Sequence, residues 1–319
     1  MELNLSTLAK HFSDEGAAWE LVEHLRWPMG PVCPHCGDIA RAYFLKPRNG
    51  SRTTTTGKVT YRRLWKCKAC RKQFSVLVGT IFERSQVPLS KWLLALYLMS
   101  ASKNGVAANE LRRILGVTQP TAWFMLHRLR DAMRQSTFQT MHGTIVADET
   151  WVGGDPGNRH NRKPYTNFST KTDKTTVFSL INADTREVHS RVVPNVTGHT
   201  LRKVIAEQVD MAGSVLYTDA AFHYRQLGQE FIHHEWVDHS SGEYVRGDVS
   251  TNKLENYFSQ LKRSIDGTHH HVSKEHLHRY LSEFDFRLST CKMSDTARLE
   301  RIIDQAEGRR LTYRRVTAA

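Results

Sequence analysis

One short stretch near the end of the chain decides the fold: STNKLENYFSQLKR, residues 250–263. Its apolar residues recur at helical spacing, which predicts an amphipathic helix with one face on a core. That apolar stripe consists of Leu254, Tyr257, Phe258, Leu261 and the nearby Ile265. Glu255 is the only acidic residue of the stretch, and it lies beside the stripe. We therefore expect the helix to dock on a sheet and to hold the Glu255 carboxylate against it.

The sequence before this helix predicts a mixed α/β domain. Three apolar runs read as strands, and the turn signal ADTR joins the second run to the third. A helix, another strand, a second helix and a short strand follow. The main elements are expected at residues 144–151, 175–182, 187–194, 200–211, 214–224 and 231–239. Strands that alternate with helices in this way favour a mixed sheet over a bundle or a sandwich.

Two carboxylates stand at strand ends, Asp148 in VADET and Asp219 in LYTDA. A buried carboxylate without a partner is unfavourable, and a shared divalent cation removes that penalty. Taken singly, each aspartate also fits a turn or capping role. Glu255 follows Asp219 after 35 intervening residues, and Lys262 lies seven positions farther on, on nearly the same helix face. A carboxylate for metal and a lysine for phosphate on one face suit a nuclease-type site.

Four cysteines form two C-x-x-C pairs: Cys33 with Cys36 in CPHC, and Cys67 with Cys70 in CKAC. Four thiolates are the tetrahedral ligand set that Zn2+ prefers at structural sites. The 30 residues between the pairs exceed the usual ribbon interval, and we assign the excess to a hairpin loop in KPRNGSRTTTTGK. The alternative is one redox pair beside a chance pair, but the thioredoxin-like context is missing. The sequence predicts structural zinc.

The same segment is strongly basic. Residues 41–72 contain 11 Lys or Arg and no Asp or Glu, with aromatic residues between them. We expect Arg62, Arg63 and Lys66 to contact DNA. The alternative is a solvated surface on a purely structural module.

A second DNA-binding element is predicted at residues 91–134, which read as three helices. Gly116 ends the second helix, and Thr118 is a plausible cap for the third. Two helices joined by a short turn that contains glycine fit a helix-turn-helix. Its polar residues Gln119 and Arg128 would then face DNA, although any helical hairpin gives a similar pattern.

The charge is divided unevenly along the 319 residues, which carry a net charge of +13 with a pI of about 9.6. Residues 1–142 hold 21 Lys or Arg against 9 Asp or Glu, whereas residues 143–319 hold 24 against 23. The basic first part of the chain suits a polyanionic partner, with nucleic acid as the first candidate and a membrane surface as the second. No apolar run is long enough to span a bilayer, and no signal peptide is visible. We expect a cytoplasmic protein with no membrane partner.

Together these motifs resemble the DDE transposases of bacterial insertion sequences, and more narrowly their zinc-ribbon-bearing family. The resemblance extends from about Trp19 to Ser289. It is carried by CPHCG…CKACRKQFSVLVGTIFE, DETWVGG, YTDAAFHY, NKLENYFSQLKR and GTHHHVSKEHLHRYLSEFDFR. The implied fold is an α/β ribonuclease H-like core preceded by a zinc ribbon and a helix-turn-helix.

The resemblance also implies residue roles. Asp148, Asp219 and Glu255 would hold two catalytic metal ions, Mg2+ or Mn2+. Phosphates near the scissile bond would be contacted by Lys262, Asn252 and Arg263. The implied reaction is cleavage at transposon ends followed by transfer of a DNA 3′-hydroxyl into target DNA. Its partner is double-stranded DNA, bound by a homo-oligomer that is nucleoid-associated when on DNA.

Four segments are expected along the chain: a helical cap and zinc ribbon at 1–82, a helix-turn-helix at 83–140, a catalytic domain at 141–290 and a basic tail at 291–319. Glu149 should point to the sheet face opposite Asp148 and is left out of the site. Glu283 and Asp285 are reserve carboxylates with a structural role as the simpler reading.

Two other functions remain open. One is another nuclease on the same core, such as a junction resolvase. The other is a non-catalytic DNA-binding regulator, which predicts a broken acidic triad.

Overall fold

The computed structural model describes residues 5–39, 41–47, 52–53, 57, 59–135, 140–153 and 174–313. The chain forms two compact units. The first comprises residues 1–102, 106–133 and 293–319, and the second comprises residues 103–105 and 134–292. None of the helices in the described ranges has the length and apolar character needed to cross a membrane.

The second unit is built around a five-stranded sheet with the order β10-β9-β6-β7-β8. β6 runs parallel to β9, and β9 runs parallel to β10, while β7 is antiparallel to both β6 and β8. The strands are β6 Met141–Val152, β7 Thr175–Asn182, β8 Val188–Val193, β9 Val209–Asp219 and β10 His233–Val237. Three antiparallel strands continued by two parallel ones make a ribonuclease H-like sheet, which confirms the predicted mixed α/β class.

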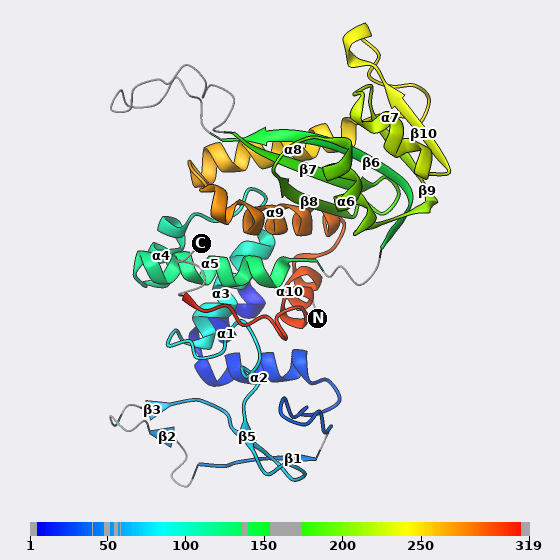
Figure 1. Cartoon of the computed structure of the whole chain (residues 1–319). Helices are drawn as coiled ribbons and strands as arrows, with labels where there is room; N and C mark the ends of the chain where they lie inside the picture. Colours follow the sequence, from blue (N-terminus) through cyan, green and yellow to red (C-terminus); the bar gives the residue numbers. More distant parts are fainter. Residues whose placement is uncertain are drawn as a thin grey trace. The chain divides into compact units, whose positions relative to one another are not determined.

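Helices cover both faces of this sheet because its strands are apolar on both sides. One face packs against α8 and α9, and the other against α6 and α7 (Figure 1). The helices are α6 Gly198–Ala206, α7 His223–Leu227, α8 Asn252–Ser264 and α9 Lys274–Ser289, with short turns η2 Gly228–Glu230, η3 His239–Ser241 and η4 Ile265–His269. The stripe predicted for α8 is buried against the sheet: Leu254, Tyr257, Phe258, Leu261 and Ile265.

The helix predicted at residues 200–211 is shorter in the structure. α6 ends at Ala206, and β9 already begins at Val209. Val209 is buried and pairs with Met141 at the start of β6, so pairing between two inner strands prevails over the local helical pattern.

The first unit combines short strands with helices. Its three-stranded sheet has the order β1-β4-β5, and β2 pairs with β3 in a separate hairpin inside the loop expected between the cysteine pairs. The strands are β1 Ala42–Phe44, β2 Arg52–Thr53, β3 Val59–Thr60, β4 Trp65–Cys67 and β5 Gln73–Phe74. The helices are α1 Leu5–Ser13, α2 Glu15–Arg26, α3 Leu89–Ala101, α4 Ala108–Leu115, α5 Gln119–Met133 and α10 Asp295–Asp304.

The end of the chain belongs to this first unit, whereas the sequence suggested a separate basic tail. The buried face of α10 consists of Leu299, Ile302 and Ile303. The Gly308 N–H donates to the Gly79 carbonyl at 2.8 Å, and Arg309 Nη1 donates to the Asp131 carbonyl at the end of α5 at 2.7 Å. The first and last parts of the chain therefore share one core.

Deletion of residues 293–319 should destabilise the first unit while leaving the second folded. The deletion uncovers the apolar face that α10 covers, and each large apolar side chain removed contributes about 1.5–3 kcal/mol. Hydrogen exchange should show lost protection in α3 and α5 but retained protection in β6, β7 and β9. A chain ending at residue 313 is the control, and protection of α3 and α5 equal to that of the full chain would contradict the shared core.

Candidate functional site

Asp148 and Asp219 lie on neighbouring parallel strands. The parallel pairing of β6 with β9 ends at Val146 and Tyr217, and each aspartate is two residues farther along its strand. Because side chains alternate along a strand, each aspartate shares the face of the residue two before it. Val146 and Tyr217 both belong to the core beneath α8 and α9. The two carboxylates thus emerge at one edge of the sheet, on the face that α8 covers.

Glu255 reaches the same face from the first turn of α8. Its Oε1 accepts a hydrogen bond from Thr251 Oγ1 at 3.1 Å and lies 3.6 Å from His239 Nδ1. Neighbouring Leu254 is fully buried in the core below, so the carboxylate is anchored at the helix start. Neither Thr251 nor His239 was anticipated; His239 lies in a loop 16 positions upstream, where no sequence signal marks it.

The electrostatics of Asp148 reflect its burial and the carboxylates around it. Burial, together with the nearby charges of Glu149, Asp219 and Glu255, raises the pKa of Asp148 to about 7, although the hydrogen bond from the Glu149 N–H opposes the shift. Desolvation and like charge both disfavour the ionised form of a carboxyl group, so both raise this pKa.

The donor set suits a hard divalent cation. One oxygen of each carboxylate has a hydrogen-bond donor: Glu149 N on Asp148, Ala221 N on Asp219 and Thr251 Oγ1 on Glu255. The second oxygen of each has no hydrogen-bond partner among the described residues. Within the described ranges, the cysteines are the group of three or more candidate ligands that lies close enough together to hold a metal ion, so the carboxylates form a more open set. An open set of oxygens is typical of Mg2+, which keeps waters and substrate phosphate as ligands.

The back of α8 is held by a buried carboxyl, Asp285 of α9. Tyr257 Oη donates to Asp285 Oδ1 at 2.6 Å, and Ser190 of β8 donates to the same carboxyl through Oγ at 2.7 Å and N at 2.8 Å. One carboxyl thereby joins α8, α9 and β8. Asp285 faces away from the candidate site, so its role is structural, which was the simpler interpretation of the sequence. Glu283 is also buried and pairs with Arg287 at 2.6 Å in the same helix.

The free energy of unfolding should depend on pH through Asp285. Burial raises the pKa of Asp285 to about 6, although hydrogen bonds from Tyr257 and Ser190 oppose the shift. The folded chain then holds this proton more tightly than the unfolded chain, so stability falls as pH rises from about 4 to about 6. Relative to D285N, wild type should lose about 3 kcal/mol over that range in urea unfolding.

Exposed Asp266 provides the matched control, because D266N should follow the wild-type pH dependence. Wild type and D285N curves that stay parallel from about pH 4 to 6.5 would contradict a raised pKa at Asp285.

The predicted phosphate-contacting residues lie on the open side of α8. Asn252 begins the helix, and Lys262 and Arg263 lie in its last turn; all three are exposed. Seven residues correspond to nearly two turns, so Lys262 lies along the same helix side as Glu255, about 10 Å farther along the axis.

Glu149 occupies the opposite face, as expected. Its Oε2 accepts a hydrogen bond from Tyr224 Oη at 2.6 Å, and its Oε1 lies 3.5 Å from His223 Nε2. Tyr224 is fully buried in the core under α6 and α7. Glu149 therefore anchors α7, the helix that follows Asp219.

The four cysteines meet in the first unit. Their ligand atoms all lie within 4.8 Å of one another, with Cys33 Sγ 3.6 Å from Cys70 Sγ and Cys36 Sγ 3.7 Å from Cys67 Sγ. Four sulfurs placed about 2.3 Å from a tetrahedral Zn2+ stand about 3.8 Å apart. The cluster fits structural zinc, and the redox-pair alternative has no support in this geometry, because each close contact joins the two pairs.

Zinc should be required for the ribbon alone. Substitution C67S should lower the zinc content from one per chain to near zero and release protection of β1, β4 and β5, because the ligand set supplies folding free energy. Metal analysis and hydrogen exchange measure both effects. C291S, which removes the exposed lone cysteine, is the control. Full zinc content in C67S would contradict the four-thiolate site.

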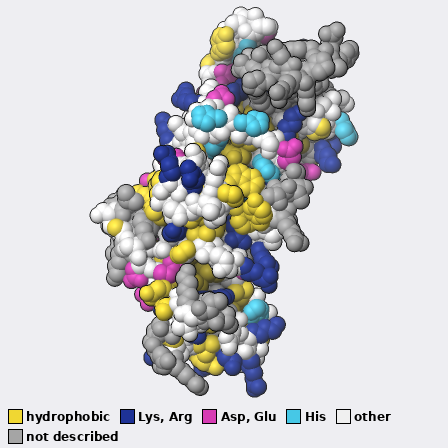
Figure 2. Space-filling view, turned by 90° about the vertical axis from the view of Figure 1, so that its left-hand side faces the viewer, with side chains coloured by type: hydrophobic (Ala, Val, Ile, Leu, Met, Phe, Trp, Pro, Cys, Tyr) yellow, Lys and Arg dark blue, Asp and Glu magenta, His cyan; other side chains and the backbone are white. Residues whose placement is uncertain are grey.

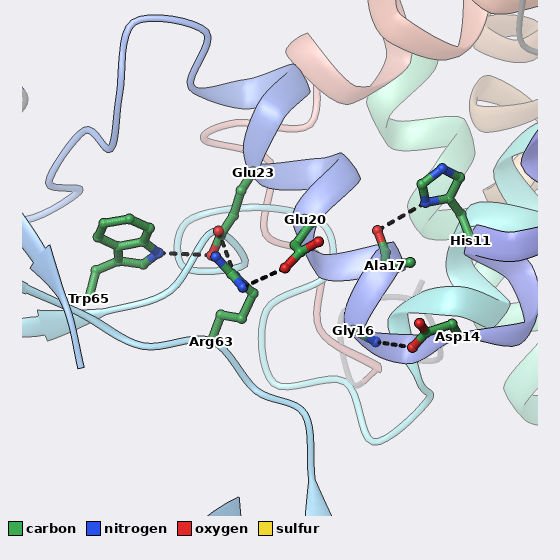
Figure 3. Close-up of polar contacts among 8 residues, drawn as sticks. All are labelled: His11, Asp14, Gly16, Ala17, Glu20, Glu23, Arg63 and Trp65. Atoms are coloured by element: carbon green, nitrogen blue, oxygen red, sulfur yellow. Dashed lines mark hydrogen bonds and ion pairs between the residues drawn. The ribbon is translucent and has the colours of Figure 1, made fainter. Parts of the chain in front are cut away.

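The predicted DNA contacts of the ribbon divide into two kinds. Arg62 is exposed and Lys66 half-buried. Arg63 instead turns toward α2: its Nε lies 2.8 Å from Glu23 Oε2 and its Nη1 3.0 Å from Glu20 Oε1 (Figure 3). Trp65 Nε1 also donates to Glu23, at 2.8 Å. Arg63 thus holds the ribbon to α2, and its expected contact with DNA stays a prediction.

In the predicted helix-turn-helix, the assignment of Arg128 needs a correction. α4 and α5 are joined by a short turn in which Gly116 adopts a left-handed conformation, and Gln119 is exposed at the start of α5. Arg128, however, is buried and donates to the backbone carbonyls of Leu311 and Glu83 at 3.1 and 2.9 Å. α5 is covered from Met125 onward, because α3, α4, α10 and the segment at Leu311 pack against it. Only the first turn of α5 is open. Exposed Lys and Arg side chains are present on the face of the protein that Figure 2 shows.

Comparison with known proteins gives two matching family models. An ISXO2-like transposase domain matches residues 140–289, and a transposase zinc-ribbon domain matches residues 13–73. An "uncharacterized protein in transposable element ISH50" of Halobacterium salinarum is 27% identical over 306 residues, 93% of this chain and 98% of the relative. An "uncharacterized transposase-like protein" of Haemophilus influenzae is 29% identical over 107 residues, 34% of this chain and 85% of the relative.

The ribonuclease H-like sheet and the four-cysteine cluster coincide with these two matched regions. The chain belongs to the zinc-ribbon-bearing DDE transposases of insertion sequences, the family that its motifs resemble.

Proposed function

We propose that this transposase cleaves DNA at the ends of its element and joins the resulting 3′-hydroxyl ends to target DNA. One observation carries the proposal: Asp148, Asp219 and Glu255 share one face at one edge of the sheet, each with an oxygen free of hydrogen bonds among the described residues. A phosphodiester placed at this edge meets carboxylates from three separate elements.

These three residues would hold Mg2+ or Mn2+, which when bound supplies charge neutralisation at the attacking and leaving oxygens. Thr251 fixes the rotamer of Glu255 through its hydrogen bond. Lys262 offers a mobile cation for the phosphate on the same helix side, and exposed Asn252 and Arg263 extend that contact along the strand.

DNA recognition would fall to the first unit. Arg62 and Lys66 of the ribbon and Gln119 at the start of α5 remain available, because helix-turn-helix proteins read bases with the first residues of the recognition helix. We propose that a homo-oligomer holds two ends together on DNA in the cytoplasm, since two ends must join one target.

Mutation of Asp219 provides the direct test on DNA carrying the element's terminal inverted repeats. D219N should slow Mg2+-dependent strand cleavage at least about 100-fold, because it removes a charge from the site but keeps the acceptor for the Ala221 N–H. Cleavage is followed on end-labelled duplexes at saturating enzyme. The matched control is D210N, on the exposed opposite end of the same strand β9.

Each outcome separates the alternatives. A wild-type chain that binds the repeats without cutting them indicates a DNA-binding regulator, and cutting of branched DNA without sequence preference indicates another nuclease of this fold. Undiminished cleavage by D219N would contradict the proposed site.

A further inference from the structure

The aromatic ring of Phe222 is unusually exposed for its place in the fold. Phe222 lies three residues after Asp219 at the carboxyl end of β9, and 80% of its surface is open. Three residues span at most about 11 Å, so the ring is adjacent to the edge that carries the carboxylates. A large apolar side chain that is exposed beside a candidate active site indicates a binding surface.

The backbone beneath the ring is firmly held. Asp219 Oδ1 accepts from Ala221 N at 3.1 Å, and the Ala221 carbonyl accepts from Tyr224 N at 3.1 Å. Phe222 itself has helical dihedral angles and accepts from Arg225 N at 3.2 Å. Fully buried Tyr224, bonded to Glu149, anchors this turn to the core. The ring is thus presented by a fixed turn rather than by a loose loop.

A cation accompanies the ring. The Arg225 guanidinium carbon lies 5.5 Å from the centroid of the Phe222 ring, and Arg225 is exposed. Among the described residues Arg225 forms no ion pair. An aromatic face beside an unpaired guanidinium is the combination that binds bases and backbone of single-stranded nucleic acid, through stacking and charge.

We propose that Phe222 and Arg225 form a stacking platform for one nucleobase that leaves the duplex beside the phosphate to be cleaved. The proposal rests on the proposed function, since it needs DNA at the carboxylate edge. Phe222 takes the base on its open face, and Arg225 contacts the flanking phosphate. Removal of that base from the stack separates the strands at the end and gives the carboxylates access to a single strand.

Photocrosslinking tests the platform without requiring cleavage. Terminal-repeat duplexes carry 5-iodouracil at one position at a time on either side of the scissile phosphate, and Ca2+ replaces Mg2+ to keep the DNA intact. Irradiation of the full-length protein should crosslink one position to the peptide that contains Phe222, identified by mass spectrometry. Crosslinks that form elsewhere in the protein but never at Phe222 would overturn the platform.

Cleavage rates in Mg2+ provide the second measurement. F222A should cleave about tenfold more slowly than wild type, F222W should restore the rate, and F222L should not, because stacking needs a π-face. The difference between wild type and F222A should fall below about twofold when the crosslinked nucleotide is replaced by an abasic site. The matched control is I232A, an exposed apolar residue (55% open) just before β10, at the sheet edge away from Asp219.

The outcomes distinguish the platform from the proposed function. A wild-type chain that crosslinks at Phe222 but never cuts supports the platform and overturns the strand-cleavage proposal. A wild-type chain that cuts while F222A cuts equally fast, or F222L restores the rate, overturns the platform alone. A change in the size of the free protein on F222A substitution, measured by sedimentation velocity, assigns Phe222 to contact between copies of the chain and also overturns it.

Discussion

The attachment of α8 to the sheet is the contact on which the candidate site depends. Asp148 and Asp219 are placed by strand pairing, but Glu255 reaches their edge only if its helix lies at a fixed height and rotation on β6 and β7. The apolar stripe supplies most of the free energy of that contact, about 1.5–3 kcal/mol for each large side chain as an upper estimate. A stripe of leucines alone allows a helix to slide. The directional hydrogen bonds from Tyr257 and Ser190 to Asp285 fix its position.

The same arrangement explains how acidic groups coexist in a basic protein. Three carboxylates brought to one edge repel one another, and burial raises the pKa of Asp148 further. Positive charge from the chain stays on the open side of α8, at Lys262 and Arg263, where a phosphate can lie between cation and carboxylate. A bound divalent cation would neutralise the site in a way that a fixed lysine cannot, because it also ligates the substrate.

Much of this fold could be predicted from local patterns. The apolar stripe of α8 has helical spacing, and β6, β7 and β8 are each a short β-type run. The two C-x-x-C pairs predict a single four-cysteine cluster. Side-chain availability was harder to predict, because it depends on segments distant in the sequence. Arg128 has the spacing of an exposed recognition-helix residue, yet Leu311, 183 positions away, accepts its hydrogen bond. Arg63 is likewise paired with acids 40 or more positions upstream. Asp285 was expected to be structural, but its partners Tyr257 and Ser190 could not be predicted, because they lie on other elements.

The central claim is that Asp148, Asp219 and Glu255 together hold the catalytic metal ions, and Fe2+-directed cleavage of the protein chain tests it most directly. Fe2+ replaces Mg2+, and with ascorbate and peroxide it generates hydroxyl radicals that cut the backbone near the bound ion. The account predicts cuts close to all three residues, each suppressed by excess Mg2+ and all lost together in E255Q. Cuts near Asp148 and Asp219 that persist in E255Q, with none near residue 255, would contradict it.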